Sequence, residues 1–327
     1  MGAMALVVDQ RGARLDAGNH DTIIVTSADG HRERVGIRSL GAVVLNGDVT
    51  LSTNTLRKLA ANGVAVTLLP VRGLSASVGF TALPERATHL RHAQHISYAQ
   101  PSARLALACT VVQNKLRAQQ EAIAERESDF DLSLAVSAAE NATSISQLMG
   151  VEGAAAAAYF ERLESYVPRE FDFSGRNRRP ARDPVNAMMS LGYTLAQSTV
   201  AQLALRSGLD LFVGFLHGIR HQRQSFALDL LEPVRPVVDR WVLYAISGKG
   251  SFSPSDFATN DADGCRLLKE PRQRFYRRWF SEAQPEIGRA ARPLLANLLR
   301  RLRHVSCPTV AIDNERVGDT VDLVVDR

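Results

Sequence analysis

The sequence is poor in cysteine, aromatic residues and lysine, and it has no long hydrophobic run. Its three cysteines, Cys109, Cys265 and Cys307, are odd in number and widely spaced, which argues against a disulfide framework and a zinc ribbon. No apolar stretch approaches the roughly 20 residues of a membrane-spanning helix, and the N-terminus lacks the charged and then apolar pattern of a secretory signal. We therefore expect a cytoplasmic protein with no membrane association.

Positive charge is carried almost entirely by arginine, which accounts for 35 of the 39 cationic residues. The formal net charge of +5 is modest, and many proteins that bind no polyanion are equally basic. Arginine, however, binds phosphate through two parallel hydrogen bonds, whereas lysine offers a point charge. The composition is therefore compatible with a nucleic-acid partner but does not require one.

The N-terminal quarter of the chain has the pattern of a small β domain. Short apolar segments between turn signals predict strands at 5–8, 22–25, 42–45 and 64–69. Gly30, after Asp29, and Gly47, between Asn46 and Asp48, mark tight turns, because glycine adopts positive φ without strain. One helix interrupts the strands, with an N-cap at 52–53 and a glycine-assisted end at 62–63.

From about residue 103 the apolar residues recur with the helical period of about 3.6. The first stripe consists of Leu105, Cys109, Val112 and Leu116. Similar stripes predict helices around 155–166, 184–206, 225–247 and 289–303. The sequence thus predicts an α+β fold made of a small N-terminal β domain over 1–86, a linker over 87–102 and a larger all-α catalytic domain over 103–327.

The predicted linker contains three histidines, His89, His92 and His95, spaced three residues apart. Residues six apart on a helix point in different directions, and no acidic residue is interleaved. A polar linker helix therefore explains them better than a metal cluster.

Candidate chemistry lies in three separate segments. His217 ends an apolar segment just before Gly218, where it is either a core histidine or a ligand. Asp229 and Glu232 share one turn of a predicted helix, so their repulsion is either relieved by solvent or offset by a cation. Glu152 lies between glycines near an alanine-rich helix, where it either favours the helix dipole or binds a closely approaching ligand.

Two arginine-rich segments provide possible contacts to nucleic acid. The first precedes the helix at Pro184 and contains Arg176, Arg178, Arg179 and Arg182. The second contains Arg272, Arg274, Arg277 and Arg278, interleaved with Phe275, Tyr276 and Trp279. Arginine next to aromatic residues suits phosphate contact with base stacking, but it is equally typical of a solvated helix face above a core.

Taken together and in order, these segments resemble the CRISPR-associated integrase and endonuclease family that captures new spacers during adaptation. The resemblance covers nearly the whole chain. It is carried by residues 43–45, 51–53, 62–64, 152–153, 159–160, 183–187, 192–193, 208–210, 214–217, 229–236, 257 and 263–267.

The resemblance implies a metal site formed by Glu152, His217 and Glu232. Asp229 would be a fourth catalytic residue, acting as an accessory ligand or from behind the ligands, and Asn186 and Tyr193 would support the site. Some family members have aspartate where this chain has Glu232. Carboxylates with one imidazole suit Mg²⁺ or Mn²⁺. From the two arginine-rich segments, we expect the arginines at 176, 178, 179, 182, 272 and 274 to bind the DNA.

The implied reaction joins the 3′-hydroxyl ends of a short DNA duplex to the edge of a CRISPR repeat by transesterification. The resemblance also implies a homodimer that binds double-stranded DNA and a small ferredoxin-like CRISPR-associated partner. Two other hypotheses remain: a nuclease that uses water as the nucleophile, and a non-catalytic DNA-binding scaffold.

Overall fold

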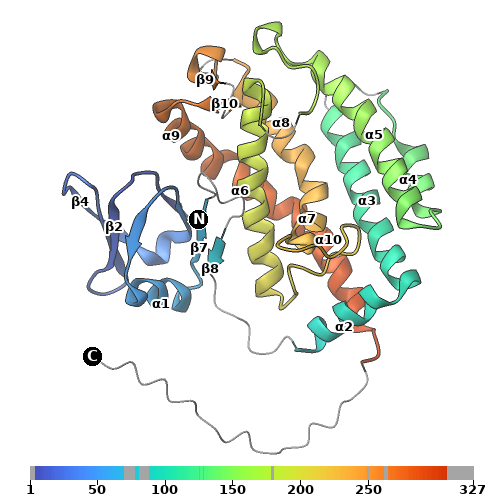
Figure 1. Ribbon diagram of the computed structural model, residues 1–327, viewed down its shortest axis with the longest axis horizontal. Coiled ribbons are helices and arrows are strands. Elements are labelled where there is room, and N and C mark those ends of the chain that lie inside the picture. The colour runs from blue at the N-terminus through green and yellow to red at the C-terminus, as the bar shows by residue number, and fades with distance from the viewer. Residues whose placement is uncertain are drawn as a thin grey trace, which may run out of the picture.

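The computed structural model describes residues 4–69, 78–80, 88–124, 126–127, 129–177, 180–248, 250–260 and 264–307. A β domain formed by the N-terminal residues lies beside a larger helical domain, as Figure 1 shows. This is the α+β architecture that the hydrophobic periodicity predicted. Within the described ranges, no helix combines the length and the apolar character needed to cross a membrane.

Among the described residues, the β domain consists of two four-stranded sheets and the helix α1 (Thr53–Ala61). The strands are β1 (Met4–Val8), β2 (Ala13–Ala17), β3 (Thr22–Thr26), β4 (Arg32–Gly36), β5 (Leu40–Leu45), β6 (Val49–Leu51), β7 (Ala65–Leu68) and β8 (Val78–Phe80). The first sheet has the order β1-β5-β7-β8, in which β8 is antiparallel to β7 and the other pairs are parallel. The second sheet has the order β4-β3-β2-β6.

The predicted strands correspond to β1, β3, β5 and β7, which supply much of the domain core. Strands β2 and β4 went unpredicted because each carries charged residues on its solvated face, and β4 forms a sheet edge. Helix α1 begins and ends as predicted: the Ser52 side chain accepts a hydrogen bond from Thr55 N at 3.1 Å, and Gly63 follows the helix with a φ of +66°.

The helical domain contains α2 (Thr88–Ala99), α3 (Pro101–Ala124), α4 (Ser133–Glu140), α5 (Ile145–Ser165), α6 (Pro184–Arg206), α7 (Ser225–Leu231), α8 (Arg235–Ala245), α9 (Lys269–Arg278) and α10 (Gln284–Arg303). A hairpin of β9 (Phe257–Asn260) and β10 (Gly264–Leu267) is inserted between α8 and α9. Short 3-10 turns occupy 37–39, 169–171, 232–234 and 254–256, and a π-helical turn occupies 279–283.

Helix α6 lies at the centre of the helical domain in Figure 1 and is defined by local signals. The Asp183 side chain accepts a hydrogen bond from Asn186 N at 2.8 Å, and Pro184 occupies the first turn, where its missing N–H is not needed. Gly208, with a φ of +79°, follows its end. The stripe predicted over 225–247 is broken into α7, a 3-10 turn and α8, because Pro233 and Pro236 cannot donate helical hydrogen bonds.

The hydrophobic residues form two core clusters, and Val44 and Leu69 of the β domain pack into the larger, mostly helical one. An ion pair also joins the domains, because Arg272 Nε on α9 lies 3.0 Å from Asp9 Oδ2 just after β1. All three cysteines are free: Cys109 and Cys265 are buried and Cys307 is half-buried. The absence of a disulfide agrees with the spacing of the cysteines in the sequence.

Candidate active site

Three segments distant in sequence bring the predicted site residues into one region. Glu152 lies on α5, His217 lies in the loop between α6 and α7, and Glu232 follows the last residue of α7. Lys115, on α3, lies between the two glutamates: its Nζ donates to Glu152 Oε1 and, at 2.5 Å, to Glu232 Oε2. The two carboxylates therefore meet at one buried ammonium group.

The loop that carries His217 is tightly folded against the start of α7. A Cβ atom on Gly214 would lie 2.6 Å from the backbone carbon and oxygen of Ser225, so only glycine fits there. The Ser225 hydroxyl and Arg223 both donate to the carbonyl oxygen of Gly218, at 2.8 and 2.6 Å. These contacts hold the loop closed around His217.

Helix α2 holds the other side of this loop. The Gln94 side chain is fully buried, and its Nε2 donates to the carbonyl oxygens of Asp210 and Val213 at 2.9 and 2.8 Å, while its Oε1 accepts from Asp210 N at 2.8 Å. Arg104, on α3, donates from Nε to the carbonyl oxygen of Phe215 at 2.9 Å. Helix α2 falls within the range expected to be a linker, and nothing in its sequence signalled that Gln94 supports the site.

The carboxylate of Asp229 organises the residues around His217. Its Oδ2 accepts hydrogen bonds from the backbone N–H groups of Phe215 and Leu216, the latter at 3.1 Å. Its Oδ1 accepts from the backbone N–H of His217 at 2.9 Å and lies 2.8 Å from Nδ1 of the ring. Asp229 was expected to be either an accessory metal ligand or a residue that supports the ligands from behind. These hydrogen bonds favour the supporting role, because they hold the proposed ligand His217 in place.

Glu232 is surrounded by cations. Its side chain is 6% exposed, and its Oε1 accepts from Arg235 Nε at 2.9 Å while its Oε2 accepts from Lys115. Burial alone would raise the pKa of Glu232, but Arg235, Lys115 and His217 outweigh it and hold the pKa well below its usual range. Asp229 and Glu232 are both buried, so a solvated acidic edge is excluded and their charges are offset within the protein.

Lys115 is a residue of the site that sequence reasoning missed. Burial lowers the pKa of its ammonium, but Glu232 and Glu152 more than compensate, and the pKa lies above its usual value. Lys115 is thus charged at neutral pH despite its burial. A lysine inside the apolar stripe of α3 was the available signal, because a buried lysine needs a partner.

A second buried carboxylate lies behind the first group. Asp239, on α8, accepts hydrogen bonds from the hydroxyls of Tyr193 and Tyr159, the latter at 3.1 Å. Burial raises the pKa of Asp239 to about 6, although both tyrosine hydroxyls oppose the shift. The ring of Tyr193 lies 4.8 Å from the guanidinium carbon of Arg235, so Tyr193 connects Asp239 to the arginine that pairs with Glu232. Tyr193 was expected to support the site, and its contacts with the site are the hydrogen bond to Asp239 and the packing against Arg235.

The side-chain chemistry fits a divalent cation, but Lys115 lies between two of the donors. Asp229 Oδ1 contacts Nδ1 of the His217 ring, and Nε2 of the same ring has no hydrogen-bond partner among the described residues. Two carboxylates and one imidazole nitrogen are donors that Mg²⁺ and Mn²⁺ accept. As the described side chains stand, however, no three His, Cys, Asp or Glu side chains are arranged to hold an ion.

Comparison with known proteins identifies the family. The sequence matches the family model for CRISPR associated protein Cas1 over residues 6–281, most of the chain. The chain belongs to the Cas1 family. A CRISPR-associated endonuclease Cas1 of Thermus thermophilus is 34% identical to this Cas1 over 260 residues, covering 79% of this chain and 76% of the relative. The resemblance drawn from the sequence is therefore confirmed.

Solved structures share the fold of this Cas1. A Cas1 protein from Thermotoga maritima superimposes with a TM-score of 0.78 at 23% identity, covering 92% of this chain and 97% of that chain. A casposase bound to an integration product gives the same TM-score and identity, covering 99% of this chain and 97% of that chain. A chain of a Cas6-RT-Cas1–Cas2 complex gives a TM-score of 0.71 at 23% identity, covering 91% of this chain and 35% of that one.

Several of the arginines expected to bind DNA are engaged within this Cas1. Arg176 donates to Asn186 Oδ1 and, at 3.0 Å, to Ser190 Oγ, and its guanidinium carbon lies 5.2 Å from the ring of Tyr193. Asn186 itself donates to Asp183 Oδ2 at 2.7 Å. Asn186 thus holds the loop before α6, and among the described residues it makes no hydrogen bond with the proposed ligands. Arg182 is exposed, and Arg178 and Arg179 lie outside the described residues.

The second arginine cluster packs above a core. Phe275, Tyr276 and Trp279 are buried, so their rings are not available to stack on bases. Arg272 pairs with Asp9, and Arg274 Nη2 lies 2.6 Å from Asp256 Oδ2. As the described residues are arranged, these arginines join parts of the protein to one another.

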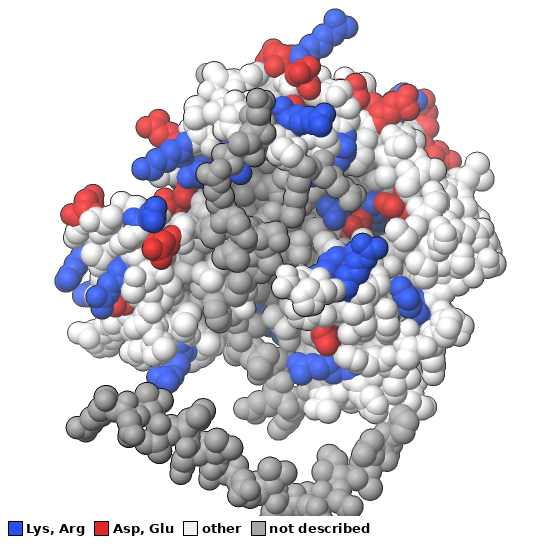
Figure 2. All heavy atoms as spheres, in the orientation of Figure 1, with Lys and Arg blue, Asp and Glu red and all other residues white. Residues whose placement is uncertain are grey.

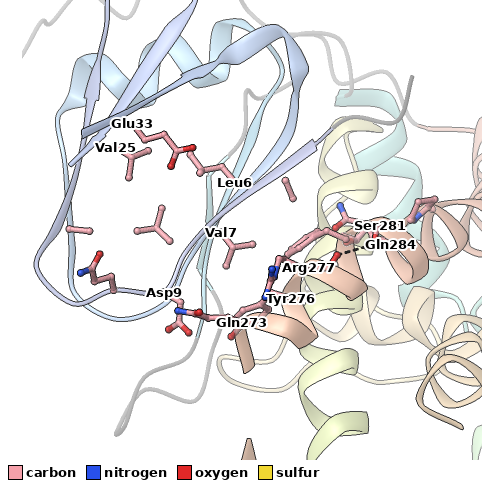
Figure 3. Close-up of a pocket in the computed structure, with 18 of the residues that line it drawn as sticks. Leu6, Val7, Asp9, Val25, Glu33, Gln273, Tyr276, Arg277, Ser281 and Gln284 are labelled. Atoms are coloured by element: carbon pink, nitrogen blue, oxygen red, sulfur yellow. Dashed lines mark hydrogen bonds between the residues drawn. The ribbon is translucent and has the colours of Figure 1, made fainter. Parts of the chain in front are cut away.

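A cavity of about 1140 Å³ lies between the β domain and the helical domain and is separate from this site. Figure 3 shows Leu6 and Val7 on one side and Tyr276 and Gln284 on the other. None of the proposed ligands lines it. In Figure 2 the surface is hollowed between the side carrying α6 and the side carrying α3 and α5, and side chains of both charges are visible there.

Proposed function

We propose that this Cas1 is a divalent-metal-dependent DNA endonuclease and integrase whose site is formed by Glu152, His217 and Glu232. The observation that carries the proposal is the convergence of two carboxylates and an oriented imidazole from three segments. Glu232 among them is buried, which an isolated carboxylate does not tolerate. The naming of the Thermus thermophilus relative as an endonuclease supports it.

Glu152, Glu232 and Nε2 of His217 would hold Mg²⁺ or Mn²⁺. When bound, such an ion polarises a phosphodiester and stabilises negative charge on the attacking or leaving oxygen. The chain's own residues prepare the site: Asp229 fixes the ring of His217, with the proton held at Nδ1. Arg235 keeps Glu232 ionised, so its carboxylate remains a donor at neutral pH.

We further propose that the reaction is transesterification by a DNA 3′-hydroxyl, in addition to cleavage by water. The match to a casposase bound to an integration product supports this choice, because integration joins DNA strands. The test is to incubate the protein with Mn²⁺, a labelled duplex bearing 3′-hydroxyl ends and a plasmid with a CRISPR repeat. Covalently labelled plasmid is the expected product, whereas nicked plasmid without label would indicate a nuclease only.

The proposed partners are double-stranded DNA, a second copy of the chain and a small Cas2-like protein. Inserting a duplex requires two 3′ ends to attack two phosphodiesters, which one monomeric site does not hold at once. The Cas6-RT-Cas1–Cas2 complex supports the Cas2-like partner. Light scattering should give the mass of a dimer for the purified chain and a larger mass after the partner is added; a monomer that gains no mass yet joins both ends would contradict the assembly.

A non-catalytic DNA-binding scaffold explains the site less well. Burying two carboxylates and a lysine is unfavourable in itself, and apolar residues of similar size would often stabilise the fold more. A scaffold would bind the labelled duplex in the joining assay but produce neither nicked nor labelled plasmid.

A further inference from the structure

Among the described charged side chains of the site, Lys115 is the one to which the proposed reaction gives no role. Its side chain is 9% exposed, and Nζ contacts Glu152 Oε1 and Glu232 Oε2, the two carboxylates proposed as metal ligands. Among the described residues, Nζ makes no other hydrogen bond. The ammonium is therefore held only by the groups that a metal ion would also use.

The other cation of the site is anchored differently. Arg235 pairs with Glu232 Oε1, the oxygen that does not contact Lys115, and its guanidinium lies against the ring of Tyr193. It can remain in place whether or not a metal is bound. Lys115 has no comparable anchor, and its ammonium is a compact charge on a flexible four-carbon stem that can swing away.

We propose that Lys115 is a built-in counter-cation, which occupies the space between Glu152 and Glu232 in the metal-free protein and leaves these carboxylates when a divalent ion binds. The inference rests on the proposed function, because it takes Glu152 and Glu232 to be metal ligands. The ammonium and the ion compete for the same oxygens, so Lys115 lowers the affinity of the free protein for metal.

The charges of the site explain why such a residue is useful. Without metal, Lys115 contacts both carboxylates and Arg235 contacts Glu232. Without Lys115, the carboxylates would repel each other in a region of low dielectric constant. A divalent ion bound between the two carboxylates would offset the same negative charges, so the ammonium is no longer needed there.

The experiment measures Mn²⁺ binding to the full chain without DNA, by the electron paramagnetic resonance signal of the free ion. Lys115→Met should bind Mn²⁺ at least about tenfold more tightly than the parent, because a unit charge in contact with both ligands is removed. Lys115→Arg, which keeps the charge, should bind no more tightly than the parent. Glu232→Gln should lose binding, and Lys269→Met, at an exposed lysine on α9, serves as the matched control and should bind like the parent.

The outcomes separate the two ideas. Glu232→Gln could abolish Mn²⁺ binding while Lys115→Met binds Mn²⁺ with unchanged or lower affinity. That result would support the proposed metal site and overturn the counter-cation role of Lys115. If no variant binds Mn²⁺, or if Glu232→Gln binds like the parent, both the proposed metal site and the inference fail.

A second measurement covers the case in which Lys115→Met does not fold. Reductive dimethylation of the parent protein, read by peptide mass spectrometry, compares Lys115 with the exposed Lys269. Modification of Lys115 relative to Lys269 should rise when Mn²⁺ is added, because the displaced ammonium loses its ion pairs. An unchanged ratio at saturating Mn²⁺ would overturn the proposal.

Discussion

Asp229 accepts one hydrogen bond from the backbone N–H of His217 at 2.9 Å, and the same oxygen lies 2.8 Å from Nδ1 of the His217 ring. One carboxylate thus fixes both the backbone and the ring of a proposed metal ligand. Because an ionised carboxylate only accepts hydrogen bonds, this contact favours a proton on Nδ1, and Nε2 has no hydrogen-bond partner among the described residues.

We expect Asp229→Asn to disturb both stability and activity. The asparagine amide would face backbone N–H groups at 215–217 as a donor, leaving some of them unpaired. The free energy of unfolding should fall by about 2–3 kcal/mol, and strand joining should fall by roughly 10–100-fold because the ring of His217 loses its orientation. Denaturant unfolding and the joining assay measure the two effects.

The matched control is Asp21→Asn in the β domain, where the carboxylate makes an exposed ion pair with Arg38. It should change stability by less than about 1 kcal/mol and leave joining unchanged. Full joining activity in Asp229→Asn would show that Asp229 does not position His217.

The three proposed ligands are expected to be individually essential. Glu152→Gln, His217→Ala and Glu232→Gln should each reduce strand joining by at least about 100-fold, because each removes one metal donor. DNA binding should stay within about threefold of the parent, since phosphate contacts dominate DNA affinity. Gel-shift titration and the joining assay test this, and a variant that joins DNA normally would remove its residue from the ligand set.

Asp239 predicts a pH dependence of stability. Burial raises its pKa from 3.8 to about 6, so between these values the unfolded chain ionises this group while the folded protein keeps it protonated. Asp239 therefore stabilises the fold most at low pH, and on the order of 3 kcal/mol of its contribution is lost as the pH rises to about 6.

Comparison with Asp239→Asn isolates this contribution, because Glu232, whose pKa is lowered, stabilises the fold in the opposite direction: its contribution is lost as the pH falls. The parent's free energy of unfolding, minus that of Asp239→Asn, should decrease from pH 4 to pH 6 and stay level above it. Guanidinium unfolding at several pH values measures the difference. A difference that increases with pH would show that Asp239 is ionised in the folded protein over this range.

The two described arginines before α6 are expected to behave differently. Arg176→Met should lower the free energy of unfolding by about 1–3 kcal/mol, because Arg176 bonds Asn186 and Ser190 inside the protein. Arg182→Gln, at an exposed position, should leave stability unchanged and reduce the slope of log K for DNA against log salt by up to about 0.9. Thermal unfolding and salt-dependent DNA binding measure both; a reduced salt slope in a fully stable Arg176→Met would assign Arg176 to the DNA surface instead.

Much of the secondary structure follows from short-range patterns in the sequence. The N-cap Asp183 with Pro184 defines the start of α6, and Ser52 defines the start of α1, because capping is decided within one turn of helix. The apolar stripe of α3 likewise marked the face that became buried. The local patterns missed the strands with charged outer faces, for which pairing with neighbouring strands outweighs local propensity.

For the site residues, too, the sequence indicated some features and the tertiary structure decided the others. Family resemblance named Glu152, His217, Asp229 and Glu232 as chemical groups. Only the tertiary structure placed Lys115 between Glu152 and Glu232, 37 and 117 residues away in the chain, and turned Arg176 inward. A lysine or an arginine in a sequence carries the same charge wherever it points. Whether that charge faces solvent, a phosphate or a buried carboxylate depends on which distant helices pack against it.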